Sequence, residues 1–79
     1  MTKFDFNDGN GPVPAHQHLN GGGWVADTAS VSDTAYVGLD AQVFDNAQVF
    51  GDARVSGTAQ VFDNAQVYGY ARVYGGRLT

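Results

Sequence analysis

The chain has 79 residues and a formal net charge of −4, from eight acidic side chains, all aspartate, against four lysines and arginines. This balance argues against direct binding to a nucleic-acid backbone, which requires lysine and arginine. The absence of cysteine excludes a disulfide framework and thiol chemistry. The length indicates one domain, and neither an apolar run that could span a bilayer nor a signal peptide is visible, so we expect a cytoplasmic protein without membrane contact.

Residues 1–24 are predicted to form an N-terminal extended cap that ends in a glycine-rich entry loop. Phe4 and Phe6 alternate as in a short strand, whereas Pro12 and Pro14 favour an irregular extended path. The end of a β stack exposes unpaired backbone groups that must be covered. We therefore expect Phe4 and Phe6 to cover the first coil of the repeat that follows.

The segment HQHLNGGGW, residues 16–24, is the least repetitive and the most distinctive chemically. One interpretation is an entry turn in which glycine permits the bend and the histidines are exposed on one face of an extended strand. The other is a site for a small anionic or aromatic ligand, with glycine N–H groups forming an anion nest and the indole stacking on the ligand. The candidate ligand-binding residues here are His16, His18, Asn20, Gly21, Gly22, Gly23 and Trp24. Because an H-x-H pair lacks the three or four ligands that zinc takes, we expect no metal and no cofactor.

Residues 25–79 are predicted to form a solenoid, because valine recurs every six residues and alanine holds a second phase of the same period. A longer period is also visible: VFDNAQVFGDARV at residues 43–55 returns eighteen residues later as VFDNAQVYGYARV. Three hexads then make one triangular coil, valine and alanine point inward, and Gly, Asp and Asn turn the corners. The valines are Val25, Val31, Val37, Val43, Val49, Val55, Val61, Val67 and Val73.

The repeat resembles the hexapeptide repeat of left-handed parallel β-helices, in which an aliphatic residue, a turn with Gly, Asp or Asn, and a small residue recur. The resemblance implies an all-β, left-handed parallel β-helix of about three coils with eighteen residues per coil. At the end of the chain, Arg77 cannot point unpaired into a valine core. We therefore expect the chain to leave the coil there, with Arg77 and Leu78 covering its end.

The residues flanking each valine point outward and form three faces. The first face carries Trp24, Gln42, Phe44, Gln60 and Phe62, the second carries Ser30, Ser32, Gln48, Phe50, Gln66 and Tyr68, and the third carries Tyr36, Arg54, Ser56, Arg72 and Tyr74. Contiguous exposed aromatic surface usually marks an interface, so Phe44, Phe50, Phe62 and Tyr68 are predicted to form a homo-oligomer interface, and the resemblance implies a homotrimer. Arg54 and Arg72 are candidates for binding a partner or an anionic ligand, or alternatively form a solvated face with cation–π pairs.

Three functions remain open from the sequence. Acyltransferases of the resembling family use an inserted loop and a catalytic histidine, neither of which is visible here. The short leader followed by bare hexads resembles small hexapeptide-repeat proteins of bacteriophages and prophages. We therefore expect a non-enzymatic homotrimeric binding module that antagonises a bacterial defence system in the host cytoplasm, by sequestering a nucleotide-type molecule or blocking a host protein. The alternatives are a phage assembly protein that stacks through its ends and a degenerate acyltransferase-like enzyme.

Overall fold

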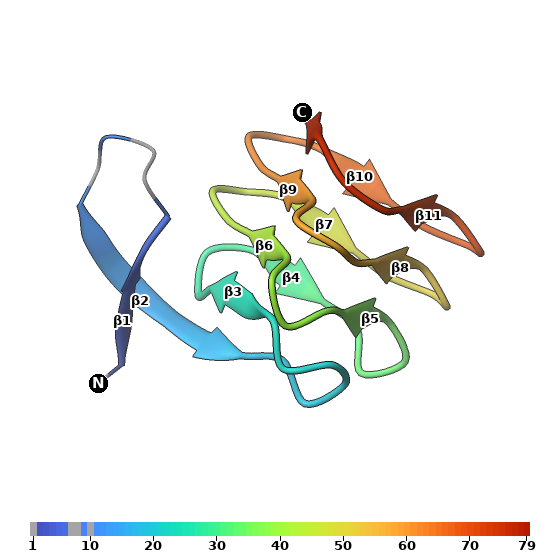
Figure 1. The fold of residues 1–79 in the computed structure, drawn as a ribbon, viewed down its shortest axis with the longest axis horizontal. Helices are drawn as coiled ribbons and strands as arrows, with labels where there is room; N and C mark the ends of the chain where they lie inside the picture. The colour runs from blue at the N-terminus through green and yellow to red at the C-terminus, as the bar shows by residue number, and fades with distance from the viewer. Residues whose placement is uncertain (1, 7–8, 10) are drawn as a thin grey trace.

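A computed structural model describes residues 2–6, 9 and 11–79, and within them every regular element is a β-strand (Figure 1). No helix in this part of the chain is long and apolar enough to cross a membrane. The strands are β1 (Lys3–Asp5), β2 (Pro12–Gln17), β3 (Trp24–Ala26), β4 (Ser30–Val31), β5 (Tyr36–Val37), β6 (Gln42–Val43), β7 (Gln48–Val49), β8 (Arg54–Val55), β9 (Gln60–Val61), β10 (Gln66–Val67), β11 (Arg72–Val73) and β12 (Arg77–Leu78).

From β3 onward the chain is a three-sided parallel β-solenoid of about three coils. Each strand pairs in parallel with the strand one coil further on, as Val25 does with Val43 and Val43 with Val61, which confirms the predicted eighteen-residue coil. The three faces are the sheet β1-β2-β3-β6-β9-β12 and the sheets β10-β7-β4 and β11-β8-β5. Figure 1 shows the coils stacked on one another, with the β1–β2 hairpin beside them.

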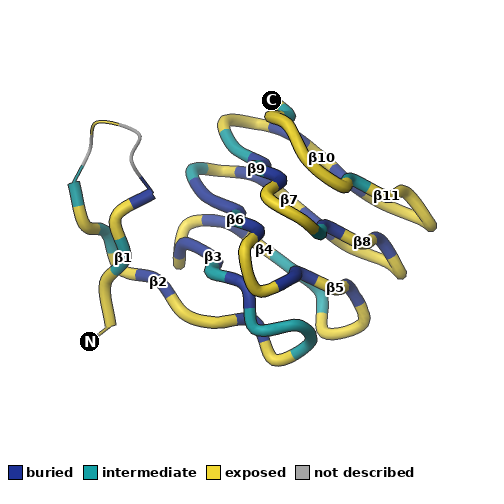
Figure 2. Tube along the Cα trace, in the orientation of Figure 1, coloured by how far each residue is buried: buried dark blue, intermediate teal, exposed yellow. Residues whose placement is uncertain are grey.

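Valine and alanine fill the interior of the coils as predicted, except that Val31 and Val73 are half-buried and Ala71, in the last coil, is exposed. Val25, Val43 and Val61 are fully buried on the first face, and the alanines at the corners are buried beside them. Figure 2 shows the buried positions recurring along successive coils. Burying one such valine contributes about 1.5–3 kcal/mol, so the repeated hexad supplies its own core without a large hydrophobic centre.

The corners depend on residues that tolerate a left-handed backbone. Asp45 and Asp63 are equivalent corner positions one coil apart, with φ of 60° and 57°. Aspartate and asparagine are the non-glycine residues that most readily adopt this conformation. At Gly57, a Cβ atom would lie 2.0 Å from the backbone oxygen of Tyr74, so the close stacking of the coils also requires glycine.

The N-terminal hairpin covers the first face as well as the end of the stack. β2 runs antiparallel to β3 and occupies its free edge, as expected for a cap. The phenylalanine side chains, however, lie across the first face: Phe6 is buried against Phe44, and Phe4 stacks on Trp24 with ring centroids 4.7 Å apart. These side chains were expected to cover the first coil; Phe4 packs there on Trp24, and Phe6 extends the cover to Phe44 of the second coil, because the hairpin folds back over the aromatic column of that face.

The last strand corrects the expectation for the C-terminus. β12 stays in the solenoid and pairs with β9, but Arg77 lies opposite Gln60 and Leu78 opposite Val61, one residue short of the eighteen-residue spacing. A one-residue shift exchanges the inward and outward sides of a strand. Leu78 therefore packs on the core, and the guanidinium of Arg77 lies over the ring of Phe62 at 4.9 Å from its centroid.

Candidate functional site: an arginine groove on the third face

The third face carries two arginines in register on consecutive coils. Parallel pairing sets Tyr36 beside Arg54 and Arg54 beside Arg72, so the three side chains form one outward column along the solenoid. Neighbouring strands lie about 4.7–4.9 Å apart. Strand pairing therefore holds the Cα atoms of the two arginines one strand spacing apart, and both side chains leave the same face.

A second column runs parallel to the first at the adjoining corner. Thr34, Asp52 and Tyr70 are separated by eighteen residues each, and buried Ala35 and Ala53 lie between the two columns. Since the alanines present no side chain outward, the surface between the columns is hollowed. The resulting groove has a volume of about 500 Å³ and is lined by Asn20, Thr34, Tyr36, Asp52, Arg54, Tyr70 and Arg72.

Asn20 reaches the groove through the entry loop. Its backbone oxygen accepts a hydrogen bond of 3.0 Å from the Val37 amide, and the Gly23 amide donates to the Val37 oxygen at 2.9 Å. These two bonds fix the loop against the edge of β5. The structure thus brings together three of the predicted ligand-binding residues, Asn20, Arg54 and Arg72.

The two arginines lack a carboxylate partner. Among residues 2–6, 9 and 11–79, neither guanidinium has an acidic group within ion-pair distance, and Arg72 donates only to the hydroxyl of Tyr74, at 3.2 Å. Two like charges one strand spacing apart repel one another by about 1 kcal/mol in water and by more where the surface excludes water. An anion on the arginines would relieve this repulsion, and Asp52, which also lines the groove, adds hydrogen-bond acceptors together with one negative charge.

The remaining candidates of the entry segment are used by the fold. The amide of Gly22 donates to the His18 oxygen and that of Gly23 to the Val37 oxygen, so two of the three glycine amides of the predicted anion nest are already used. At Gly21, φ is +110°, and a Cβ atom would lie 2.2 Å from the Val37 oxygen. Gly21 and Gly23 are therefore required for the close contact between the entry loop and the backbone of residues 37–38. Trp24 packs in the hairpin cluster with Phe4 rather than facing a ligand.

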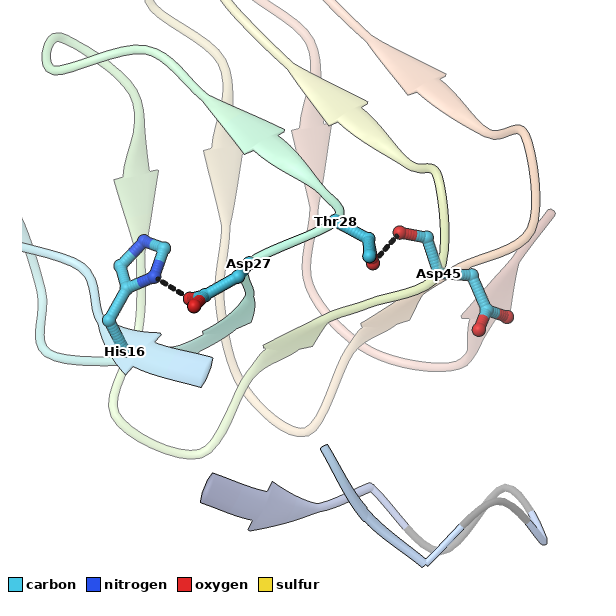
Figure 3. Close-up of polar contacts among 4 residues, drawn as sticks. All are labelled: His16, Asp27, Thr28 and Asp45. Atoms are coloured by element: carbon cyan, nitrogen blue, oxygen red, sulfur yellow. Dashed lines mark hydrogen bonds and ion pairs between the residues drawn. The ribbon is translucent and has the colours of Figure 1, made fainter. Parts of the chain in front are cut away.

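The two histidines do not share a face, contrary to expectation, because β2 ends at Gln17 and the chain turns inward. His18 is 5% exposed, and its Nε2 lies 2.8 Å from the Ala35 oxygen. His16 remains exposed on β2, where its Nδ1 lies 2.8 Å from the carboxylate of Asp27 (Figure 3). His18 therefore ties the entry segment to the first coil, and His16 ties β2 to the corner after β3.

The predicted interface residues separate into two groups. Phe44 is 3% exposed beneath Phe6, and Phe62 is half-buried beneath Arg77, so the first face is covered by the chain itself and is not a free aromatic surface. On the second face, Phe50 and Tyr68 stack with centroids 5.5 Å apart and remain 41% and 59% exposed. Of these two faces, the second therefore presents its aromatic column to solvent.

Sequence reasoning did not assign Thr34, Asp52 and Tyr70 to the site. They lie at corner positions of the hexad, which the sequence pattern assigns to turning the chain and not to binding. The available signal was their eighteen-residue spacing, which places them on consecutive coils beside the arginine column. Within the part of the chain that the structure describes, no group of three His, Cys, Asp or Glu residues could hold a metal ion.

Comparison with known protein families supports the β-solenoid architecture. A family model described as the YdcK Beta solenoid repeat matches residues 41–57, 47–61 and 59–75. No curated protein and no solved structure matches the chain significantly. The matched segments contain both arginines of the groove as well as Phe50 and Tyr68. The stacked coils and these matches together identify the chain as a repeat β-solenoid protein, similar over residues 41–75 to the YdcK solenoid repeat.

Proposed function

We propose that the chain is a non-enzymatic binding module that holds a small anionic ligand of nucleotide type in the groove of the third face. The observation that carries this proposal is the pair Arg54 and Arg72, aligned on consecutive coils without a carboxylate partner among the described residues 2–6, 9 and 11–79. The guanidinium fork matches the oxygens of a phosphate in two parallel hydrogen bonds. A groove of about 500 Å³ is also within the range of small-ligand sites.

The other groove residues suit the uncharged part of such a ligand. Tyr36 and Tyr70 supply aromatic rings for stacking, and the Asn20 amide supplies both a donor and an acceptor. Because the protein carries a net charge of −4, the arginines provide local attraction for an anion on an otherwise acidic molecule. These features favour sequestration of a small molecule over the blocking of a host protein, since the site is concave and small.

The proposal includes assembly through the second face. Phe50 and Tyr68 are exposed there, and their stack continues over two coils. We propose a homotrimer that contacts through this column, related to the hexapeptide-repeat proteins and acting on a defence signal in phage-infected bacteria. End-to-end stacking is less favoured, because β2 occupies the edge of β3 and the entry loop bonds to Val37 at the same end of the solenoid.

The test is calorimetric titration with pyrophosphate of the wild-type protein, of the Arg54→Gln and Arg72→Gln variants, and of the double variant. Each single substitution is expected to weaken binding roughly tenfold or more, since a hydrogen bond to a charged group is worth about 1.5–3 kcal/mol. Arg77→Gln is the matched control, because Arg77 lies on Phe62 outside the groove. Absence of binding to the wild type, or equal losses in the control, would contradict the proposal.

A further inference from the structure

The groove has two chemically different ends along the solenoid axis. Its N-terminal end is formed on the first coil by Tyr36 and on the entry loop by Asn20, neither of which is charged. Arg54 follows on the second coil and Arg72 on the third. A ligand aligned with the axis therefore meets a neutral aromatic and amide end and then two cations in succession.

The number of cations limits the number of phosphoryl groups. Each guanidinium presents one planar fork that takes the oxygens of one phosphoryl group, and the two forks extend from strand positions that are one strand spacing apart. The column holds Tyr36 in place of a third arginine, so a third phosphoryl group would have no cationic partner within it. The arrangement therefore matches two linked phosphoryl groups better than one or three.

The neutral end matches a purine base. Tyr36 is 37% exposed, so part of its ring is available for stacking. An asparagine amide can donate to and accept from the edge of adenine simultaneously. Tyr36 and Asn20 are held near each other, because a Cβ atom on Gly21, the residue after Asn20, would lie 3.0 Å from the Tyr36 ring.

Asp52 lies on the same coil as Arg54, in the neighbouring corner column. Its carboxylate accepts hydrogen bonds and repels negative charge. At that level, beside Arg54, it would accept a hydrogen bond from a sugar hydroxyl.

We propose that the third-face groove binds a nucleoside diphosphate along the solenoid axis, with the base on Tyr36 and Asn20, the α-phosphate on Arg54 and the β-phosphate on Arg72. This inference rests on the proposed function and specifies the ligand class and its orientation. The order of contacts follows from the order of coils, because the three column positions are fixed by parallel strand pairing.

The test compares the affinities of adenosine diphosphate, adenosine monophosphate and pyrophosphate by calorimetric titration. For the wild type, the diphosphate is expected to bind about tenfold more tightly than either of the other two, since each lacks one group of contacts. In Arg72→Gln, adenosine diphosphate should bind no better than the monophosphate, whose own affinity is unchanged. Arg54→Gln should weaken both nucleotides about tenfold, and Arg77→Gln should weaken neither.

The outcomes separate this inference from the proposed function. If none of the three anions binds, the anion site itself is wrong. If all three bind equally and the affinity falls in both groove variants, the groove binds anions but the assignment of a nucleoside diphosphate is wrong. If Arg72→Gln weakens the monophosphate as much as the diphosphate, the proposed direction along the axis is overturned. Both arginines are exposed, so their substitution is expected to leave the solenoid intact. Circular dichroism of each variant verifies this.

Discussion

Phe6 stacks on Phe44 with ring centroids 4.9 Å apart and ring planes inclined by 20°. This contact joins the N-terminal hairpin to the second coil. Phe6 precedes the repeat in the sequence, whereas Phe44 belongs to it. Phe44 in turn stacks on Phe62 at 5.1 Å, so an aromatic column that the repeat places outside the core becomes a second core.

Replacing Phe6 by alanine is expected to lower the free energy of unfolding by about 3 kcal/mol, because a buried ring is lost and a cavity remains. Phe4→Ala should cost less, since Phe4 is only half-buried. Urea unfolding measures both changes, and amide exchange should show faster exchange in β1 and β2 of the Phe6 variant. Equal costs for the two variants would contradict the role assigned to the Phe6–Phe44 contact.

Gly21→Ala is expected to be more destabilising than Gly69→Ala, although both glycines have positive φ. A Cβ atom at Gly21 would collide with the Val37 oxygen at 2.2 Å, whereas one at Gly69 would meet nothing within 4 Å. The free energy of unfolding of the Gly69 variant should therefore fall by only about 1–2 kcal/mol, the cost of a positive φ for a residue with a Cβ atom. Thermal unfolding of the two variants provides the comparison, and a smaller loss at Gly21 would refute the close contact between the entry loop and β5.

His18→Phe is expected to destabilise the protein by about 1–3 kcal/mol, because the buried oxygen of Ala35 loses its hydrogen-bond partner. The matched surface change, His16→Gln, should cost at most about 1 kcal/mol, since its contact with Asp27 is exposed. Chemical denaturation of both variants measures these two losses of stability. If the His16 variant proved less stable than the His18 variant, the inward turn at His18 would not have the structural role described.

The period of the sequence was sufficient to predict the coils but not what covers them. Spacing of six and eighteen residues determines which side chains share a column, and this prediction held for Val43, Phe50 and Arg54. It contains no information on the docking of a segment outside the repeat, which is why Phe44 was expected to be exposed. The register of β12 was missed for a related reason: nothing local to Arg77 shows the one-residue shift that turns Leu78 inward.

The candidate binding site was also predicted only in part, because the sequence does not show which residues the fold uses for its own contacts. Arg54 and Arg72 were identified as candidates because they face outward on the same side of the coil, although a solvated face with cation–π pairs was the alternative; the glycines of the entry segment were likewise open to two interpretations. The structure assigns those glycines to backbone contact. Tyr70 and Asp52 were not recognised, since a corner position already accounts for aspartate and gives no reason to look for a ligand.

Tyr68→Glu is expected to convert a trimer into monomers, because charge would be placed in the aromatic column of the second face. Light scattering coupled to size-exclusion chromatography measures the change, from about three times the chain mass of 8.4 kDa to that mass. Tyr74→Glu is the control, since Tyr74 is also exposed but belongs to the third face. A wild-type monomer, or loss of the trimer in the control alone, would contradict assembly through Phe50 and Tyr68.

The central claim is that the paired arginines of the third face hold a small anion. Native mass spectrometry of the protein purified gently from bacterial cells tests it most directly, with the Arg54→Gln/Arg72→Gln double variant prepared in parallel. The account predicts a discrete added mass on the wild-type protein that disappears on denaturation and is absent from the double variant. An identical added mass on both proteins would contradict it, because the bound molecule would then lie outside the arginine groove.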